Sequence, residues 1–251
     1  MKQGNPSPAT SSEFTTAQYS EAYGPGVEGI YWHLSRNRII LSFLRRLPPG
    51  RVLDVGCGRG ILVDYLVRSG VDCYGVELGN PPVPEHLRDR LICGKASSGL
   101  PADFRASVGV IVLGDVIEHL QDPPSFLKTL LEDFPAAHSF VVTVPARSEL
   151  WSNYDEHYGH YRRYDLQSLE AELASARIGT IESSYMFRLL YPLARLALAF
   201  QGKRETRITA PTRPLIHRLA AALLYGDFVL LPATLYGTSV ICSGRRTLWS
   251  K

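Results

Sequence analysis

The chain has 251 residues, of which 45% are apolar and 20% are charged, so it is long enough to bury a full hydrophobic core. Its 27 Lys and Arg residues against 24 Asp and Glu residues give a formal net charge of only +3. Such a small excess argues against a nucleic-acid partner. The four cysteines lack paired spacing and no secretory signal pattern opens the sequence, so we expect a cytoplasmic protein with free thiols.

The expected organisation is an arm followed by one domain. Residues 1–28 begin with a stretch rich in Ser, Thr and Pro, and we expect them to form a flexible N-terminal arm. Residues 29–251 are expected to form a single domain. Apolar residues at helical spacing predict its first helix over residues 30–47, which ends at Pro48-Pro49-Gly50.

From residue 51 onward, short apolar runs alternate with segments of helical periodicity. The runs predict seven strands, over residues 51–55, 71–78, 90–93, 107–113, 139–144, 178–185 and 238–243. The segments between them predict helices, over residues 61–68, 123–134 and 165–176. Strands and helices that alternate at this spacing predict an α/β fold, with a mostly parallel sheet and helices on both faces.

A glycine-rich segment, Asp54-Val55-Gly56-Cys57-Gly58-Arg59-Gly60, follows the first predicted strand. Glycines let the backbone approach a ligand closely, and the next helix presents its N-terminal N–H groups to the same place. In open α/β sheets ligands bind at the carboxyl ends of the strands, which is where this segment lies. The third glycine follows the second by two residues instead of three, so the segment is not the dinucleotide-binding fingerprint.

Two further landmarks follow later strands. Glu77 ends the second predicted strand, and Gly114-Asp115-Val116-Ile117-Glu118-His119-Leu120 follows the fourth. With the glycine-rich segment, they resemble the class I S-adenosylmethionine-dependent methyltransferases, in particular the ubiquinone-biosynthesis-like branch (methyltransferase types 11 and 23). The resemblance implies a Rossmann-like seven-stranded sheet and S-adenosyl-L-methionine as the cofactor. It also implies that Glu77 holds both ribose hydroxyls, because a carboxylate accepts two hydrogen bonds from a diol.

The same resemblance implies that an N-terminal tyrosine pair, Tyr19 and Tyr23, folds over the cofactor and excludes water. Packing on one helix face explains the spacing of the pair equally well. The residues that we expect to contact the cofactor come from four separate stretches of the chain: Tyr19, Tyr23, Asp54, Gly56, Cys57, Gly58, Gly60, Glu77, Leu78, Asp115 and Val116.

Methyl transfer from a sulfonium needs alignment and, for an O–H or N–H acceptor, a place for the proton. His119 lies one turn beyond the fourth strand and is the first candidate for the base, although a packing role fits it equally well. His157 and His160 are candidates of lower rank, in a segment rich in His, Arg and Tyr. The segment resembles an element that helps to close the acceptor site in related methyltransferases; the alternative is a polar surface loop.

A metal site is a separate hypothesis. Some relatives, among them small-RNA 2′-O-methyltransferases and certain quinone methyltransferases, bind a divalent ion through Glu-x-x-Glu-His after the fourth strand. This chain has Asp115, Glu118 and His119 there, and oxygen-plus-imidazole ligation is chemically reasonable. Because matching residue types do not establish converging geometry, we expect no metal. A metal-dependent RNA 2′-O-methyltransferase stays an alternative function.

Residues 186–237, before the last strand, are expected to form a helical insertion with two apolar, arginine-flanked stretches, 187–200 and 215–231. This pattern fits a cap over a hydrophobic acceptor with peripheral membrane contact, and it fits a homodimer interface equally well. The preferred function is methyl transfer to an oxygen of a hydrophobic small molecule or lipid-like acceptor. A non-catalytic cofactor-binding or scaffold protein is the remaining alternative.

Overall fold

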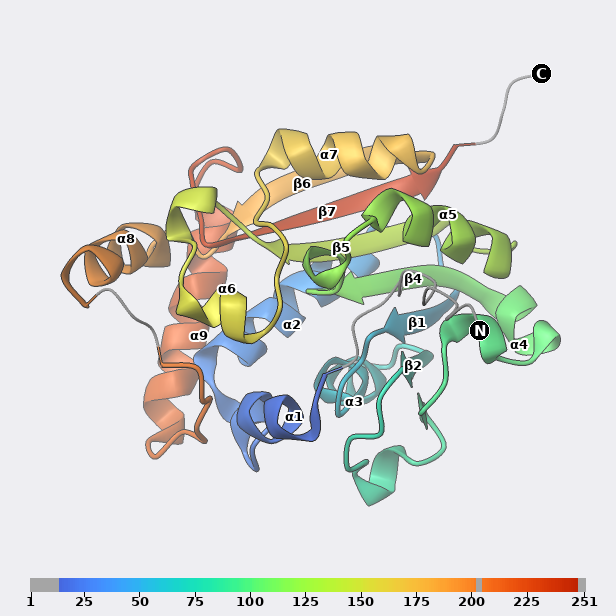
Figure 1. Cartoon of the computed structure of the whole chain (residues 1–251), viewed down its shortest axis with the longest axis horizontal. Coiled ribbons are helices and arrows are strands. Elements are labelled where there is room, and N and C mark those ends of the chain that lie inside the picture. Colours follow the sequence, from blue (N-terminus) through green and yellow to red (C-terminus); the bar gives the residue numbers. More distant parts are fainter. Residues whose placement is uncertain (1–13, 202–204, 248–251) are drawn as a thin grey trace, which may run out of the picture.

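The computed structural model describes residues 14–201 and 205–247. In this part of the chain seven strands form one sheet in the order β3-β2-β1-β4-β5-β7-β6 (Figure 1). β7 is antiparallel to its neighbours β5 and β6, and the other paired strands are parallel, which confirms the predicted Rossmann-like sheet. The strands are β1 (Arg51–Val55), β2 (Cys73–Glu77), β3 (Leu91–Cys93), β4 (Val108–Gly114), β5 (Ser139–Pro145), β6 (Ile178–Met186) and β7 (Ser239–Arg246).

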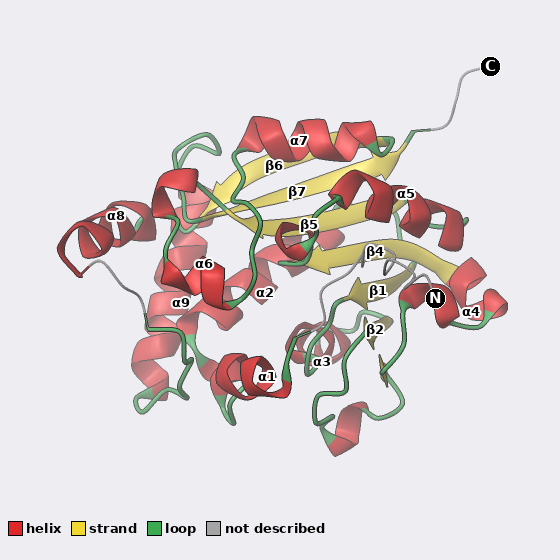
Figure 2. Ribbon diagram, in the orientation of Figure 1, coloured by secondary structure: helices red, strands yellow, loops and turns green. Residues whose placement is uncertain are grey.

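Helices cover both faces of the sheet, as predicted (Figure 2). One core lies between the sheet and the helices that contribute Leu127 and Leu169, and the other lies under the helices that contribute Phe43, Leu66 and Leu224. The α-helices in the described residues are α1 (Thr16–Ala22), α2 (Tyr31–Leu44), α3 (Ile61–Arg68), α4 (Ala102–Ser107), α5 (Pro123–Asp133), α6 (Asn153–His157), α7 (Leu166–Ser175), α8 (Leu190–Gln201) and α9 (Pro214–Leu230).

β4 shows why the central strands read as continuous apolar runs. Ile111 and Leu113 belong to the core under α5 and α7, whereas Val110 and Val112 belong to the core under α2, α3 and α9. A strand that is covered on both faces needs apolar residues at every position, not at every second one. The insertion between β6 and β7 consists of α8 and α9, as expected for residues 186–237.

The order of the sheet places a ligand site at one edge. β1 pairs with β2 on one side and with β4 on the other, so the chain reverses its direction of growth between β1 and β4. Open α/β sheets bind ligands at the carboxyl ends of the strands beside such a reversal. The short helix η4 (Ile117–His119), which follows β4, and the loop after α6 reach the same edge (Figure 1).

The N-terminal segment differs from the expected flexible arm over residues 14–28. α1 begins with a capping box, in which the side chains of Thr15 and Gln18 bond each other's backbone N–H groups. Glu21 pairs with His157 at 2.6 Å, between Oε2 and Nε2, which ties the helix to α6. Residues 14–28 of the expected arm thus contain a helix that contacts a distant part of the chain. Residues 1–13 of the predicted arm lie outside the described residues.

Candidate cofactor and acceptor site

The glycine-rich loop after β1 is shaped by backbone conformations that side chains rarely adopt. Gly56 and Gly58 have φ values of 78° and 54°. A Cβ atom on Gly56 would lie 2.8 Å from Cγ2 of Val116, and one on Gly58 would lie 2.6 Å from the hydroxyl of Tyr23. Gly60 caps α3 with a φ of 80°. The loop is therefore bare backbone between its neighbours, as close approach to a ligand requires.

Glu77 ends β2 directly beside this loop and is 9% exposed. Its Oε2 accepts a hydrogen bond from the N–H of Gly58 (2.8 Å), and its Oε1 accepts one from the N–H of Gly79 (3.2 Å). The hydroxyl of Tyr19 donates to the same Oε1 at 2.9 Å. A hydroxyl group thus already lies against this carboxylate, and the role of Glu77 as the acceptor for ribose hydroxyls stays a prediction.

An ion pair between Arg36 and Asp115 lies at the carboxyl ends of β4 and β5, near the buried Asp54 of β1. Asp54 is 3% exposed, and burial raises its pKa to about 7 although the nearby Arg36 guanidinium opposes the rise. Nη2 of Arg36 lies 3.0 Å from Oδ2 of Asp115, and it also donates a hydrogen bond to Oγ1 of Thr143. A Cβ atom on Gly114 would overlap the guanidinium of Arg36. The glycine therefore makes room for a buried arginine at the carboxyl edge.

Two residues that we expected to contact the cofactor, Cys57 and Leu78, do not present exposed side chains beside the loop. Cys57 points its side chain into the core, where its Sγ would lie 2.6 Å from a Cβ atom on Gly75. Burial and the carboxylate of Asp54 raise the pKa of the Cys57 thiol. Its contribution to the loop is the backbone N–H, which donates to the carbonyl oxygen of Val76 at 3.2 Å. Leu78 follows Glu77 and is half-buried.

α1 covers the loop and brings an aromatic cluster with it. The rings of Tyr19 and Tyr23 lie 6.2 Å apart, and the ring of Phe14 lies 5.6 Å from that of Tyr19. Phe14 also meets the ring of His119 at 5.2 Å, so the cover reaches from Glu77 to the end of β4. A groove beside this cover is lined in part by Tyr19, Tyr23, Arg59 and Asn80.

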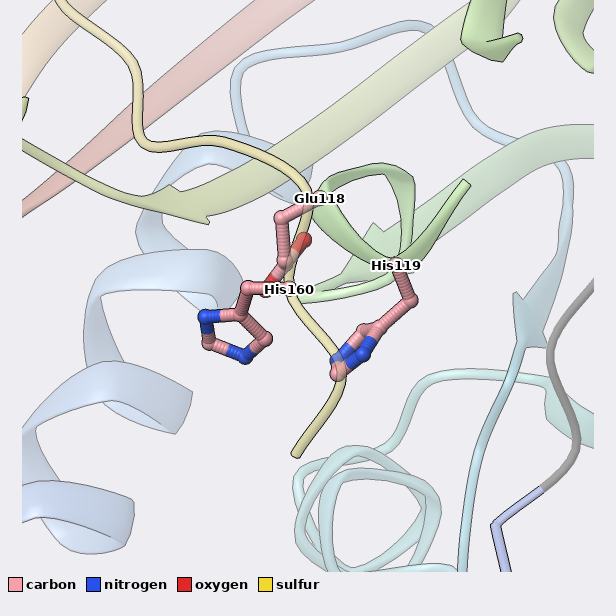
Figure 3. Close-up of side chains that lie close together, drawn as sticks. All are labelled: Glu118, His119 and His160. Atoms are coloured by element: carbon pink, nitrogen blue, oxygen red, sulfur yellow. The ribbon is translucent and has the colours of Figure 1, made fainter. Parts of the chain in front are cut away.

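His119 and His160 meet at the end of β4, in an edge-on contact with ring centroids 4.6 Å apart (Figure 3). Nδ1–H of His119 donates to the carbonyl oxygen of Tyr158 at 3.0 Å, which leaves the lone pair on Nε2. Burial and the neighbouring His160 lower the pKa of His119 to about 3. His119 is therefore neutral at physiological pH and a weak base.

Asp155 holds His160 in place. Its Oδ1 accepts from Nδ1–H of His160 at 2.8 Å, and both of its oxygens accept from Arg163, at 2.8 and 3.0 Å. Burial opposes ionisation of Asp155, but the hydrogen bonds from His160 and Arg163 outweigh it and lower the pKa to about 2. A carboxylate on Nδ1 fixes the tautomer of an imidazole and orients its Nε2. His157 is not part of this cluster and pairs with Glu21 of α1 instead.

Glu118 lies beside the two histidines, and the ligand atoms of Glu118, His119 and His160 are within 4.8 Å of one another (Figure 3). Glu118 is fully buried, and neither of its carboxylate oxygens has a hydrogen-bond partner among the described residues. Burial and Asp115 raise the pKa of Glu118 well above its usual range. This trio differs from the trio in the sequence hypothesis, because Asp115 faces Arg36 and His160 takes the third position.

Sequence reasoning missed three residues of this edge. Arg36 had a visible signal, since it is a charged residue on the apolar face of a helix that also bears Ile40 and Phe43. Phe14 had none, because its contact with His119 joins residues far apart in the chain. The orienting role of Asp155 depends on the fold of the loop after α6, which brings the Nδ1 of the nearby His160 to its carboxylate.

The fold and this site together define an S-adenosylmethionine-dependent methyltransferase, with S-adenosylmethionine as the cofactor. A family model described as a methyltransferase domain matches residues 31–176, more than half of the chain. The chain therefore belongs to this family of methyltransferases. The bare glycine loop and the carboxylate of Glu77 fit the cofactor.

Similar proteins agree at the level of the family. A ubiquinone biosynthesis O-methyltransferase of Pectobacterium carotovorum is 29% identical over 138 residues, which are 50% of this chain and 58% of that protein. One from Acinetobacter baylyi is 30% identical over 105 residues, 38% of this chain and 43% of that protein. The chain thus spans about half the length of the curated relatives it matches.

Solved structures share the fold at low sequence identity. The 1,6-didemethyltoxoflavin-N1-methyltransferase of Burkholderia thailandensis, solved with S-adenosylhomocysteine, has a TM-score of 0.52 and 19% identity, over 91% of this chain and 84% of that chain. A putative methyltransferase in complex with the Trm112 activator of Haloferax volcanii has a TM-score of 0.57 and 16% identity, over 94% and 100%. These similarities concern the fold alone.

Proposed function

We propose that this methyltransferase transfers its methyl group to an oxygen of a hydrophobic small molecule. The observation that carries the proposal is the Asp155–His160 pair, 2.8 Å between Oδ1 and Nδ1. With His119 this pair forms what we call the acceptor edge, and the glycine loop and Glu77 form the cofactor edge. An O–H acceptor must lose its proton during transfer, and an imidazole oriented by a carboxylate is suited to take it. The named activity of the ubiquinone biosynthesis relatives agrees with an oxygen acceptor.

S-adenosylmethionine supplies an activated methyl group, so the chain has to align and deprotonate the acceptor. Gly58 and Glu77 hold the nucleoside side of the cofactor. The buried positive charge of Arg36 favours binding of the carboxylate of the cofactor's methionine part. His160 takes the acceptor proton on Nε2 as the O–CH₃ bond forms and the C–S bond breaks. Asp155 then stabilises the imidazolium. His119, with its low pKa, stays neutral beside His160.

The test is transfer of labelled methyl groups to a panel of apolar phenols and catechols, amines and short RNAs. We expect O-methylated phenols or catechols as products, identified by mass spectrometry. Products formed only on amines or RNA would contradict the proposal while leaving the methyltransferase assignment intact.

A second candidate involves a divalent cation, and the specific observation in its favour is Glu118. A fully buried carboxylate without hydrogen-bond partners is unfavourable unless it is protonated or binds a cation. His119 and His160 flank it, each held through Nδ1 by a carbonyl or carboxylate oxygen, as is usual for metal-bound imidazoles. In this case the cation would polarise the acceptor oxygen, and His160 would be a ligand in place of a base.

Metal content after dialysis separates the two candidates. For the cation, elemental analysis would find about one equivalent of a divalent metal in the wild type, and its loss in Glu118→Gln but not in the exposed control Glu132→Gln. The second candidate would be contradicted if the wild-type protein contained no metal and was still fully active.

A further inference from the structure

α8 presents an apolar stripe to the outside of the molecule. Leu193, Leu196 and Phe200 are 61%, 59% and 82% exposed, and their spacing of three and four residues places them on one side of the helix. None of the residues of α8 whose exposure is described is buried. The stripe therefore covers nothing in the described part of the chain.

α9 has two apolar sides, of which the chain uses one. Ala221 and Leu224 are buried on the side that packs on α2. On the opposite side, Leu219 and Leu223 are 64% and 62% exposed. A helix that is apolar all round is normally enclosed, so this second side calls for a further partner. The exposed apolar residues of the two helices, here the α8–α9 surface, are Leu193, Leu196, Phe200, Leu215, Ile216, Leu219, Leu223, Val229 and Leu230.

The charges around the α8–α9 surface are mainly positive. Arg207, Arg213 and Arg218 are exposed at the start of α9 and in the segment before it. Among the described residues from 187 to 238 there are two acids. Asp227 is buried, where it accepts from the backbone N–H of Arg188 at 2.8 Å, and Glu205 is the one that is exposed. An apolar surface bordered by arginines is complementary to an anionic lipid bilayer.

A second copy of the chain fits these charges less well. A two-fold contact brings the same patch of both copies together, so the arginines of each copy would face those of the other. Like charges in such a contact are unfavourable. Spanning the bilayer is not an option for the described helices, because none is both long enough and apolar enough to cross a membrane.

The α8–α9 surface also lies at the end of the molecule that holds the site. α8 and α9 lie on the side to which β4 and β5 point, near α1 and α6 (Figure 1). Tyr191 of α8 donates to Glu149, which follows β5, at 2.6 Å. The segment between the two helices meets α1, where the N–H of Ile208 donates to the carbonyl oxygen of Glu21 at 3.0 Å.

We propose that the α8–α9 surface docks the enzyme on an anionic lipid bilayer, with both helices in the plane of the interface. The leucines and Phe200 enter the boundary between headgroups and acyl chains, and the arginines contact lipid phosphates. The orientation turns the carboxyl edge of the sheet toward the lipid. The proposal does not depend on the identity of the methyl acceptor.

Vesicle flotation with the full chain tests the proposal. We expect the wild type to float with vesicles of phosphatidylcholine and phosphatidylglycerol, and to float much less with phosphatidylcholine alone. Leu193→Ser with Phe200→Ser, and Leu219→Ser with Leu223→Ser, should each weaken partitioning more than about tenfold. Ile181→Ser, a 51% exposed residue of β6, is the matched control and should leave it unchanged.

Charge reversal adds an independent arm that leaves the apolar residues in place. Arg213→Glu and Arg218→Glu should each weaken binding to the anionic vesicles about fivefold or more, in a salt-dependent way, whereas Arg45→Glu at the end of α2 should not. Unchanged affinity for S-adenosylhomocysteine shows that each variant is folded. The proposal is overturned if the wild type floats with neither vesicle. It is also overturned if the wild type is a dimer that the serine variants dissociate and that does not bind lipid.

Discussion

The cofactor edge and the acceptor edge of the sheet adjoin at β1 and β4 but are built in different ways. At the cofactor edge, Gly56 and Gly58 lie in one short loop, Glu77 ends the next strand, and backbone N–H groups supply two of its bonds. At the acceptor edge, His119 and His160 come from segments that are separated by all of β5. A backbone site can thus be recognised from local sequence, whereas a side-chain site depends on tertiary contacts.

The acceptor edge should show the largest effect on turnover. His160→Ala removes the proposed proton acceptor and should lower kcat by about 100-fold or more. Affinity for S-adenosylhomocysteine, measured by calorimetry, should stay within about twofold, because the two edges use different residues. The control His86→Ala changes a half-exposed histidine after β2 and should leave both quantities unchanged. A parallel loss of cofactor affinity in His160→Ala would show that the two edges are not separate.

At the cofactor edge, Gly58→Val should lower the affinity for the cofactor, which His160→Ala should leave unchanged. The new side chain would meet the ring of Tyr23 and would need an unfavourable positive φ, so cofactor affinity should fall by about 100-fold. Gly99→Val is the matched control, because a Cβ atom there has open space and its backbone has no positive φ. If the two variants bound the cofactor with equal affinity at equilibrium, the glycine loop would not be the cofactor site.

The buried Asp54 of β1 lies near the Arg36 guanidinium, and its effect is on stability. Its pKa of about 7 in the folded protein is above the value of 3.8 for an unperturbed carboxyl group, so ionisation favours the unfolded state. The free energy of unfolding should therefore fall as the pH rises from about 4 to 7, by up to about 4 kcal/mol. Asp54→Asn should remove most of this slope in urea titrations without cofactor. An unchanged slope would mean that Asp54 is ionised throughout.

The smallest effect concerns the cover over the cofactor edge. Tyr19→Phe removes the hydroxyl that donates to Oε1 of Glu77, and the cofactor then has to displace no protein donor. Affinity for S-adenosylhomocysteine should rise by up to about fivefold, since one such hydrogen bond contributes about 1 kcal/mol. Tyr74→Phe, on the far side of β2 against Phe104, should have no effect. Weaker binding by Tyr19→Phe would show that the hydroxyl contacts the cofactor directly.

The strands could be predicted because burial on both faces leaves a plain record in the sequence, as in residues 107–113, which match β4 (Val108–Gly114). The glycine loop and Glu77 could be located for a related reason, since each role requires one residue type at one place on the strands. These features are local, and the structure places them together.

The rest depends on contacts that no local pattern contains. Residues 14–28 contact Glu77 and His157, which lie far along the chain, so their composition alone suggested an arm. Sequence reasoning ranks His119 first, and only the structure shows Asp155 on Nδ1 of His160 and the low pKa of His119; which histidine acts as the base stays a prediction. The metal hypothesis named Asp115 for the same reason, since only tertiary structure shows its partner Arg36.

The most direct test of the account is the affinity for S-adenosylhomocysteine of Glu77→Ala, compared by calorimetry with the exposed control Glu85→Ala. Two charge-assisted hydrogen bonds to the ribose are lost, so binding should weaken by about 100-fold or more in Glu77→Ala and stay unchanged in the control. Equal and tight binding by both variants would contradict the assignment of this carboxylate, and with it the position of the cofactor.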